Sequence, residues 1–238
     1  MKLYRLRNAV FFILFVLSCN TIIAQQLRTF GNYSIFFEDT NKGIIRGVEA
    51  GIDYTDIEDD EERSGTRIAF QLSAAYITLG NKTQENYDWD NSVTETLSTK
   101  GYAINTSLGV KIYNLFLDEY LGVDGLDYFI MPKVNIARIA ATENFTSRDE
   151  YNSFNTFDQQ RNSKNWQCYF GIEIGYEFFL SENNSNSVVL TANFNGLNFS
   201  NAFKKMPYNN MDYSYGGNFG VGASFYFGIK KKKEKHRN

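Results

Sequence analysis

Histidine, cysteine and proline are scarce in this sequence of 238 residues. The single histidine is His236, in a basic stretch near the C-terminus, and the two prolines are Pro132 and Pro207. Most acid–base, nucleophilic and zinc sites depend on histidine or on clustered cysteines. The shortage therefore argues against an enzyme, and we expect no catalytic residues, no cofactor and no metal site.

The two cysteines do not predict a disulfide. Residues 1–24 have the layout of a secretory signal peptide, in which basic residues precede an uncharged run over 9–18 and Ala24 supplies the small residue before the cut. Removal of this segment takes Cys19 with it and leaves Cys168 as the only thiol of the mature chain. The alternative is lipoprotein processing at Cys19.

A long hydrophobic run is also missing beyond residue 25. No uncharged stretch there approaches the roughly 18 residues that a membrane helix requires, and the mean hydropathy is −0.38. A transmembrane β-barrel gives the same average, because its strands alternate lipid-facing apolar residues with interior polar ones. Periodicity therefore has to separate a soluble chain from a membrane barrel.

What the sequence does have is repeated alternation with a period of two, which is typical of strands. Segment 166–180 is the clearest, with Trp166, Phe170 and Ile172 on one face and Glu173 and Glu177 on the other. Seven segments are well supported and an eighth, at 27–38, is weaker. The other six segments are 43–55, 67–80, 101–113, 126–142, 188–198 and 213–229.

A soluble β-sandwich or lipocalin-like barrel would alternate too. The expected inner faces here are rich in Gly, Ser, Asn and charged residues, which are too small and polar for the core of a soluble barrel. The apolar faces are wide and would cause aggregation in water. The pattern predicts an all-β, antiparallel, up-and-down transmembrane barrel of about eight strands over residues 25–229, with a soluble periplasmic binding barrel as the alternative.

Three of the four expected external connections are the longest in the chain. If both termini face the periplasm, the external loops are 39–42, 81–96, 143–164 and 200–212, and the periplasmic ones are 56–65, 115–124 and 181–187. The external set carries many aromatic residues, which could pack together as a cap or contact an envelope protein or small ligand. The candidate contact residues are Trp89, Tyr151, Phe154 and Tyr208.

Several features resemble one known family. The segment around Ala24, the alternation over 43–54 and a glycine-rich aromatic last strand ending at Gly228 resemble the PorT-like outer-membrane β-barrel proteins, similar in shape to the OmpA-type and OmpX-type eight-stranded barrels. The resemblance implies a location in the outer membrane of a Gram-negative bacterium and transfers no activity. Two departures are Pro132, which would need a bulge or a later strand start, and the basic tail 230–238, which follows the last strand.

Charged residues on the expected inner faces form the second candidate site. We expect them to make a structural salt-bridge network, because charges buried in a narrow barrel must pair; a conducting path is the alternative. The residues are Glu49, Asp53, Arg67, Lys111, Lys133, Glu173 and Glu177.

Two further charged segments flank the predicted periplasmic side. The acidic connection within 56–62 is expected to be a solvated turn, with divalent-cation binding as the alternative. The basic tail 230–238 is expected in the periplasm, where it could engage anionic lipid headgroups. The acidic body and the export signal argue against nucleic-acid binding.

Together these features predict a non-enzymatic outer-membrane barrel with a structural, adhesion or partner-assembly role. Its expected partners are outer-membrane lipid and an envelope protein or small ligand at the external loops. The alternative function is a narrow pore or small-ligand transporter.

Overall fold

The computed structural model describes residues 25–38, 44–56, 66–90, 92–114, 126–151, 156–180, 186–203 and 217–229. The predicted signal peptide 1–24 and basic tail 230–238 lie outside the described residues. The elements are β1 (Gln25–Glu38), β2 (Ile44–Asp56), β3 (Arg67–Asp88), β4 (Val93–Tyr113), β5 (Leu126–Asp149), β6 (Thr156–Phe179), β7 (Ser187–Asn195), the short helix α3 (Ser200–Phe203) and β8 (Gly217–Gly228).

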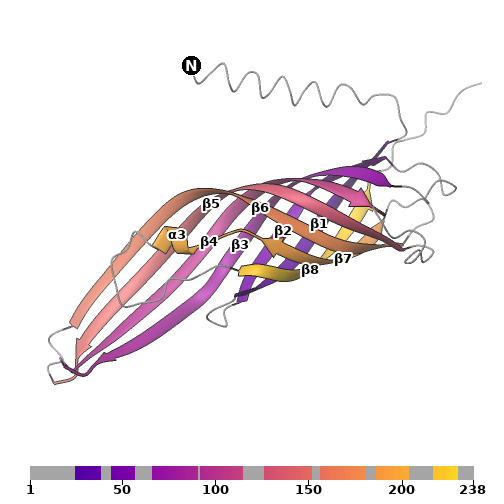
Figure 1. Ribbon diagram of the computed structural model, residues 1–238. Coiled ribbons are helices and arrows are strands. Elements are labelled where there is room, and N and C mark those ends of the chain that lie inside the picture. Colours follow the sequence, from indigo (N-terminus) through magenta and orange to yellow (C-terminus); the bar gives the residue numbers. More distant parts are fainter. Residues whose placement is uncertain are drawn as a thin grey trace, which may run out of the picture.

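The eight strands form one closed antiparallel ring. Each strand pairs with the next along the chain, and β1 pairs with β8 to close the barrel (Figure 1). Closure satisfies the backbone groups that an open sheet would leave unpaired at its edges. The predicted eight-stranded up-and-down barrel is confirmed.

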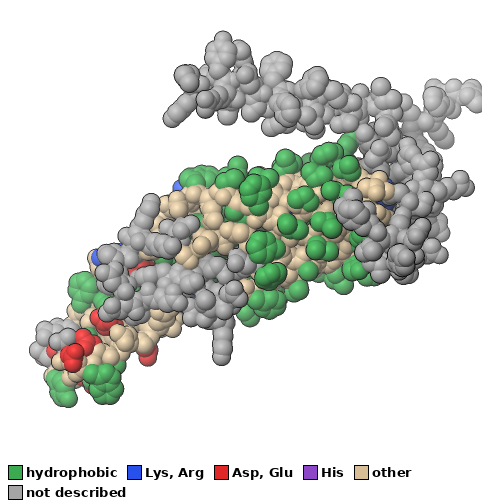
Figure 2. All heavy atoms as spheres, viewed as in Figure 1, with side chains coloured by type: hydrophobic (Ala, Val, Ile, Leu, Met, Phe, Trp, Pro, Cys, Tyr) green, Lys and Arg blue, Asp and Glu red, His purple; other side chains and the backbone are tan. Residues whose placement is uncertain are grey.

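Alternate side chains point to opposite sides of the barrel wall, as the pleat of a strand dictates. On β6, Trp166 and Phe170 are 67 % and 73 % exposed, whereas Glu177 on the opposite face is fully buried. Apolar side chains cover the outside of the barrel body (Figure 2). A water-soluble barrel has the reverse arrangement, with its apolar face inside.

Strand length divides the barrel into two halves. β3 to β6 contain 22, 21, 24 and 24 residues, but β1, β2, β7 and β8 contain 14, 13, 9 and 12. The four long strands remain paired beyond the ring, as far as Asp88 with Val93 and Arg148 with Thr156. We call this four-stranded continuation, residues 80–100 and 142–165, the extension (Figure 1).

The extension corrects two predicted loops. Residues 81–96 and 143–164 are strand for most of their length, and the connections are confined to residues 89–92 and 150–155. Outward positions there, such as Thr94, Thr96 and Ser98, are polar, so the apolar alternation that identified the other strands is missing. The frequent threonines still favour an extended backbone, because β-branched side chains fit a pleated sheet.

Pro132 lies inside β5 with neither a bulge nor a later strand start. The β4–β5 pairing is interrupted opposite Val110 and Lys111 and resumes in the same register at Ile112 with Ile130. On the other side, Pro132 pairs normally with Ile172 of β6. Because proline has no N–H, the β4–β5 ladder has a local gap at this point, but the strand continues on both sides of it.

Inward-facing glycines make room for inward-facing aromatic rings. Gly175 pairs across the strands with Phe129, and a Cβ atom at Gly175 would lie 2.7 Å from the Phe129 Cζ atom. Gly220 pairs with Phe36, and its Cβ would lie 2.6 Å from the Phe36 Cδ1 atom. Each ring thus packs over the bare backbone of a neighbouring strand, which fills a narrow barrel without widening it.

Candidate functional site

A buried charge cluster fills the lumen near the end where the described chain starts and stops. Arg28 of β1 donates to Asp53 of β2 and to Glu177 of β6, at 2.5 Å in each case. Tyr113 of β4 donates its hydroxyl to Glu177 at 2.6 Å. The Arg28, Asp53 and Glu177 side chains are all fully buried, so their charges are neutralised by each other and not by bulk water.

Lys111 of β4 completes this cluster. Its Nζ atom lies 3.6 Å from Asp53 and 4.0 Å from Glu177, beyond hydrogen-bonding distance but close enough for attraction. It also lies 3.9 Å from the centre of the Tyr226 ring, a cation–π contact. Two cations thus face two carboxylates, and the cluster is neutral overall.

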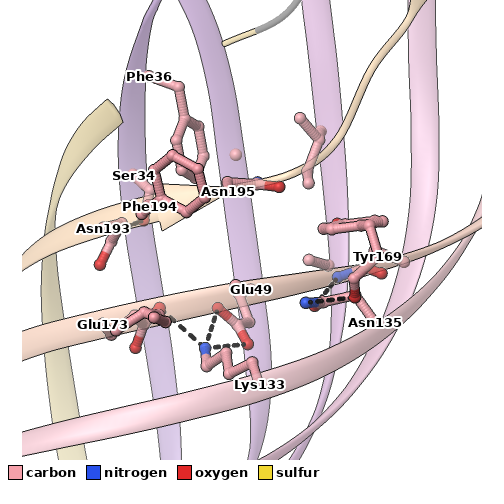
Figure 3. Close-up of a pocket in the computed structure, with 16 residues that line it drawn as sticks. Ser34, Phe36, Glu49, Lys133, Asn135, Tyr169, Glu173, Asn193, Phe194 and Asn195 are labelled. Carbon is pink, nitrogen blue, oxygen red and sulfur yellow. Dashed lines mark hydrogen bonds and ion pairs between the residues drawn. The ribbon is translucent and has the colours of Figure 1, made fainter. Parts of the chain in front are cut away.

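A second cluster lies farther along the lumen. Lys133 of β5 donates to Glu173 of β6 at 2.8 Å and to Glu49 of β2 at 3.1 Å (Figure 3). Ser73 and Ser107 also donate hydroxyl hydrogen bonds to Glu49. The lysine and the two carboxylates therefore cross-link β2, β5 and β6 through the barrel interior.

Six of the seven sequence-predicted interior charges are brought together in these two clusters. The seventh, Arg67, forms an ion pair with Asp127 of β5 and lies over the ring of Tyr113 at 5.0 Å, next to the first cluster. Arg28 and Asp127 also face the lumen and were not among the predicted interior charges. Both were in principle detectable, because Arg28 is in phase with the inner-facing residues of β1 and Asp127 with Lys133 of β5.

A cavity of about 50 Å³ adjoins the second cluster. Asn105 lines it. The other lining residues include Asn135, Asn193, Tyr169 and Lys133 (Figure 3). Asn105 donates to Asn135 at 3.0 Å, and the amide oxygens of Asn105 and Asn193 have no hydrogen-bond partner among the described residues. A space of this size and polarity suits one or two water molecules and is too small for a sugar or nucleotide.

The segment after β7 closes the far mouth of the lumen. Leu197, Phe199 and Phe203 are buried against inner-facing residues of several strands, including Phe36 and Leu79. The Gly196 and Asn198 amides are hydrogen-bonded to β6, at 3.1 Å each. We call residues 196–203 the plug segment.

The plug segment corrects the predicted external loop 200–212 at its start. Residues 200–203 form α3, and Phe203 is buried in the barrel mouth. β7 likewise ends at Asn195, whereas the alternation had suggested residue 198.

Two of the four candidate contact residues stand at the tip of the extension. Trp89 and Tyr151 are 83 % and 86 % exposed. The Trp89 ring packs edge-on against Tyr87, with ring centres 4.6 Å apart. The Tyr87 hydroxyl donates to Glu150 at 3.2 Å, which connects the end of β3 to the residue that follows β5. Phe154 and Tyr208 lie outside the described residues.

The described residues contain no group of three or more His, Cys, Asp or Glu side chains that could hold a metal ion. Of the acidic connection within 56–62, only Asp56 is among the described residues, and His236 is not among them. No helix in the described ranges is long and apolar enough to cross a membrane.

Comparisons with known proteins gave structural matches only. No family model matches, and no curated protein matches by sequence. A major outer membrane protein from Thermus thermophilus matches with 12 % identity and a TM-score of 0.44, covering 86 % of this chain and 100 % of that one. Ail, the attachment invasion locus protein of Yersinia pestis, in complex with the heparin analogue sucrose octasulfate, matches with 9 % identity and a TM-score of 0.35, covering 85 % and 97 %. Neisserial surface protein A matches with 7 % identity and a TM-score of 0.32, covering 86 % and 97 %.

The class of the protein follows from its own geometry. A closed antiparallel ring with an apolar exterior and a charged interior defines an up-and-down transmembrane β-barrel. The PorT-like family resemblance stays a prediction, because no family model matches.

Proposed function

We propose that this protein is a closed, non-enzymatic barrel of a bacterial outer membrane that holds a rigid contact surface away from the lipid. The observation that carries the proposal is the extension, which continues four paired strands beyond the ring and ends in the exposed rings of Trp89 and Tyr151. The predicted export signal at 1–24 and the apolar barrel exterior support the location.

The length of the extension supports a role outside the bilayer. β4 continues for eight residues from Val93 to Lys100, which corresponds to roughly 25 Å along a strand. Its outward side chains are Thr94, Thr96, Ser98 and Lys100, which do not suit a hydrocarbon environment. A projecting sheet of this kind is pre-organised, so a partner that binds its tip does not have to order a flexible loop.

The filled lumen favours a closed barrel that carries the contact surface, and argues against a pore. Fully buried charges occupy one level, the Lys133 cluster occupies the next, and the plug segment packs apolar rings into the mouth. An eight-stranded barrel is just wide enough for side chains to fill its interior. We expect planar-bilayer recordings of the purified protein to show no steady unit conductance.

Site-specific photo-cross-linking tests the proposed contact surface. Benzoylphenylalanine placed at Trp89 or Tyr151 in cells should give adducts with the same protein or polysaccharide partner. Benzoylphenylalanine at Phe225, a half-exposed position on the outer face of β8, is the control and should react with lipid only. The proposal fails if the two tip positions give no adduct beyond those formed at Phe225 in a barrel that is correctly inserted.

A further inference from the structure

We propose that the outer surface of β4, β5 and β6 binds the phosphate group of a membrane lipid where the barrel meets the extension. The groups that would hold it are Arg138 and Lys164, with Lys100 at the upper rim and the rings of Tyr102 and Trp166 beside them. This inference rests on the proposed membrane location and adds a ligand class and a site to it.

On the outer face of these three strands, the side chains change from mostly apolar to polar at one level. On the side of the ring, most outward positions are apolar, including Ile104 and Ile136, which are 54 % and 55 % exposed. Above it, outward residues of the extension are polar, including Thr142 and Asn162, which share a hydrogen bond at 2.8 Å. A hydrocarbon boundary must fall between these rows, because the lower residues need lipid and the upper ones need water.

Arg138 lies at this boundary with its side chain exposed on the outer face. It pairs across the strands with Ile104 of β4 and Trp166 of β6, so its nearest neighbours are apolar. No ion pair joins Arg138 or Lys164 to any other residue in the described ranges. A permanently charged guanidinium in such a row is tolerated only near the interface, where it reaches a polar headgroup.

The strand register places a small residue next to Arg138. Ala140 follows Arg138 on the same face of β5 and pairs with Tyr102 on one side and Lys164 on the other. Arg138 itself pairs with Trp166, which lies two residues beyond Lys164 on β6, so the two cations are diagonal neighbours with Cα atoms about 7–8 Å apart. One phosphate group can therefore lie within reach of both long side chains.

Phosphate fits this arrangement better than other headgroup chemistry. A guanidinium can donate two parallel hydrogen bonds to phosphate oxygens, and a lysine adds a mobile charge. Tyrosine and tryptophan rings at the boundary would hold the glycerol and upper acyl region of the same lipid. The site is therefore expected to prefer phospholipid or phosphorylated glycolipid over an uncharged glycolipid.

Native mass spectrometry of the detergent-solubilised full chain tests this preference. The probes are phosphatidylglycerol and digalactosyldiacylglycerol with matched acyl chains, of which only the first carries phosphate. The unaltered protein should retain phosphatidylglycerol and lose the galactolipid. Arg138→Gln and Lys164→Gln should each weaken phosphatidylglycerol retention about fivefold, the effect of one interfacial charge.

Arg148→Gln is the matched control, because Arg148 is an exposed outward arginine at the far end of β5. It should leave retention unchanged. An equal loss in Arg148→Gln, or equal retention of both lipids, would overturn the assigned site. A stable adduct of inorganic phosphate alone that Arg138→Gln abolishes would mean that the site binds a free anion and not a lipid.

Folding is monitored in every variant by heat-modifiable gel mobility, which reports an intact barrel. If the barrel folds and inserts but shows no preference for phosphate, this inference is wrong and the proposed function is unaffected. If the chain is released from membranes without detergent, the proposed function itself is wrong.

Discussion

At the scale of single residues, the barrel interior depends on the pairing of buried charges. Arg28 is the centre of the first cluster, because it contacts both Asp53 and Glu177 while Lys111 stays at 3.6 Å or more from either carboxylate. A buried ion pair contributes little compared with an apolar pair, but loss of one partner leaves an uncompensated charge in a low dielectric. Arg28 is therefore the residue whose removal should do most damage.

We predict that Arg28→Met lowers the free energy of unfolding by about 3–5 kcal/mol. Methionine replaces the aliphatic stem of the arginine and leaves only the space of the guanidinium group, so most of the loss reports the two carboxylates that lose their partner. Urea titration in lipid vesicles, read by heat-modifiable mobility, measures the change. Arg148→Met removes the same charge from an exposed position and should not move the midpoint. Equal midpoints for the two variants would contradict the proposed structural role of the cluster.

On the outer face, a charged side chain is destabilising because no partner charge or water is present in the hydrocarbon. Ala223 of β8 lies between Tyr33 of β1 and Leu190 of β7, which are 47 % and 52 % exposed on the outside. We predict that Ala223→Arg destabilises the inserted barrel by about 2–4 kcal/mol if this position lies near the bilayer midplane. Ala223→Leu adds bulk without charge and should fold like the parent. If the arginine variant is as stable as the leucine variant, this face does not contact hydrocarbon.

At the scale of elements, strand pairing depends on matched glycines and rings. We predict that Gly175→Ala destabilises the barrel by about 1–3 kcal/mol, because its Cβ would lie 2.7 Å from Phe129 and 2.9 Å from the Leu190 carbonyl oxygen. Gly31→Ala is the control, since nothing lies within 4 Å of a Cβ atom there. Equal stability of the two variants, measured by urea titration, would show that the barrel wall adjusts to the added methyl group.

The elements differ in how far the sequence could predict them. Alternation located the spanning strands because lipid on one side and a packed lumen on the other impose opposite chemistries on neighbouring residues, as at Phe170 and Glu173. The extension has water on its outer side, so this contrast fades and residues 81–96 resemble a loop. The plug segment was unpredictable for another reason: Phe199 and Phe203 are buried by packing against distant strands, which no local pattern encodes.

The candidate site shows the same limit. Inner-facing positions on β2, β4, β5 and β6 could be assigned from phase alone, but the partner of each charge depends on register between strands. Lys133 contacts Glu49, which is 84 residues away along the chain, because β2 and β5 face each other across the lumen. Phase predicts which charges are inside, and only the closed ring decides which of them meet.

At the scale of the whole molecule, the barrel and the extension are separable in principle. Within the described residues, pairing with β2 ends at Leu79 and pairing with β7 begins at Gly171, so neither of these strands forms a ladder with the extension. The residues that fill the lumen, including Arg28, Lys133 and Phe199, come from below it or from the plug segment. The ring should therefore not need the extension in order to close.

We predict that a chain lacking the extension folds and inserts but loses its partner. Replacing residues 82–99 and 143–161 with Asn-Gly turns keeps the last pairs of the ring, Leu79 with Gly101 and Ala141 with Ser163. Heat-modifiable mobility and the urea midpoint should stay close to those of the parent. Capture of the cross-linked partner should disappear, because Trp89 and Tyr151 are gone. If the shortened chain instead restores the phenotype of a deletion strain, the activity resides in the lumen or in the predicted periplasmic segments, and the acidic connection within 56–62 and the basic tail 230–238 become the better candidates.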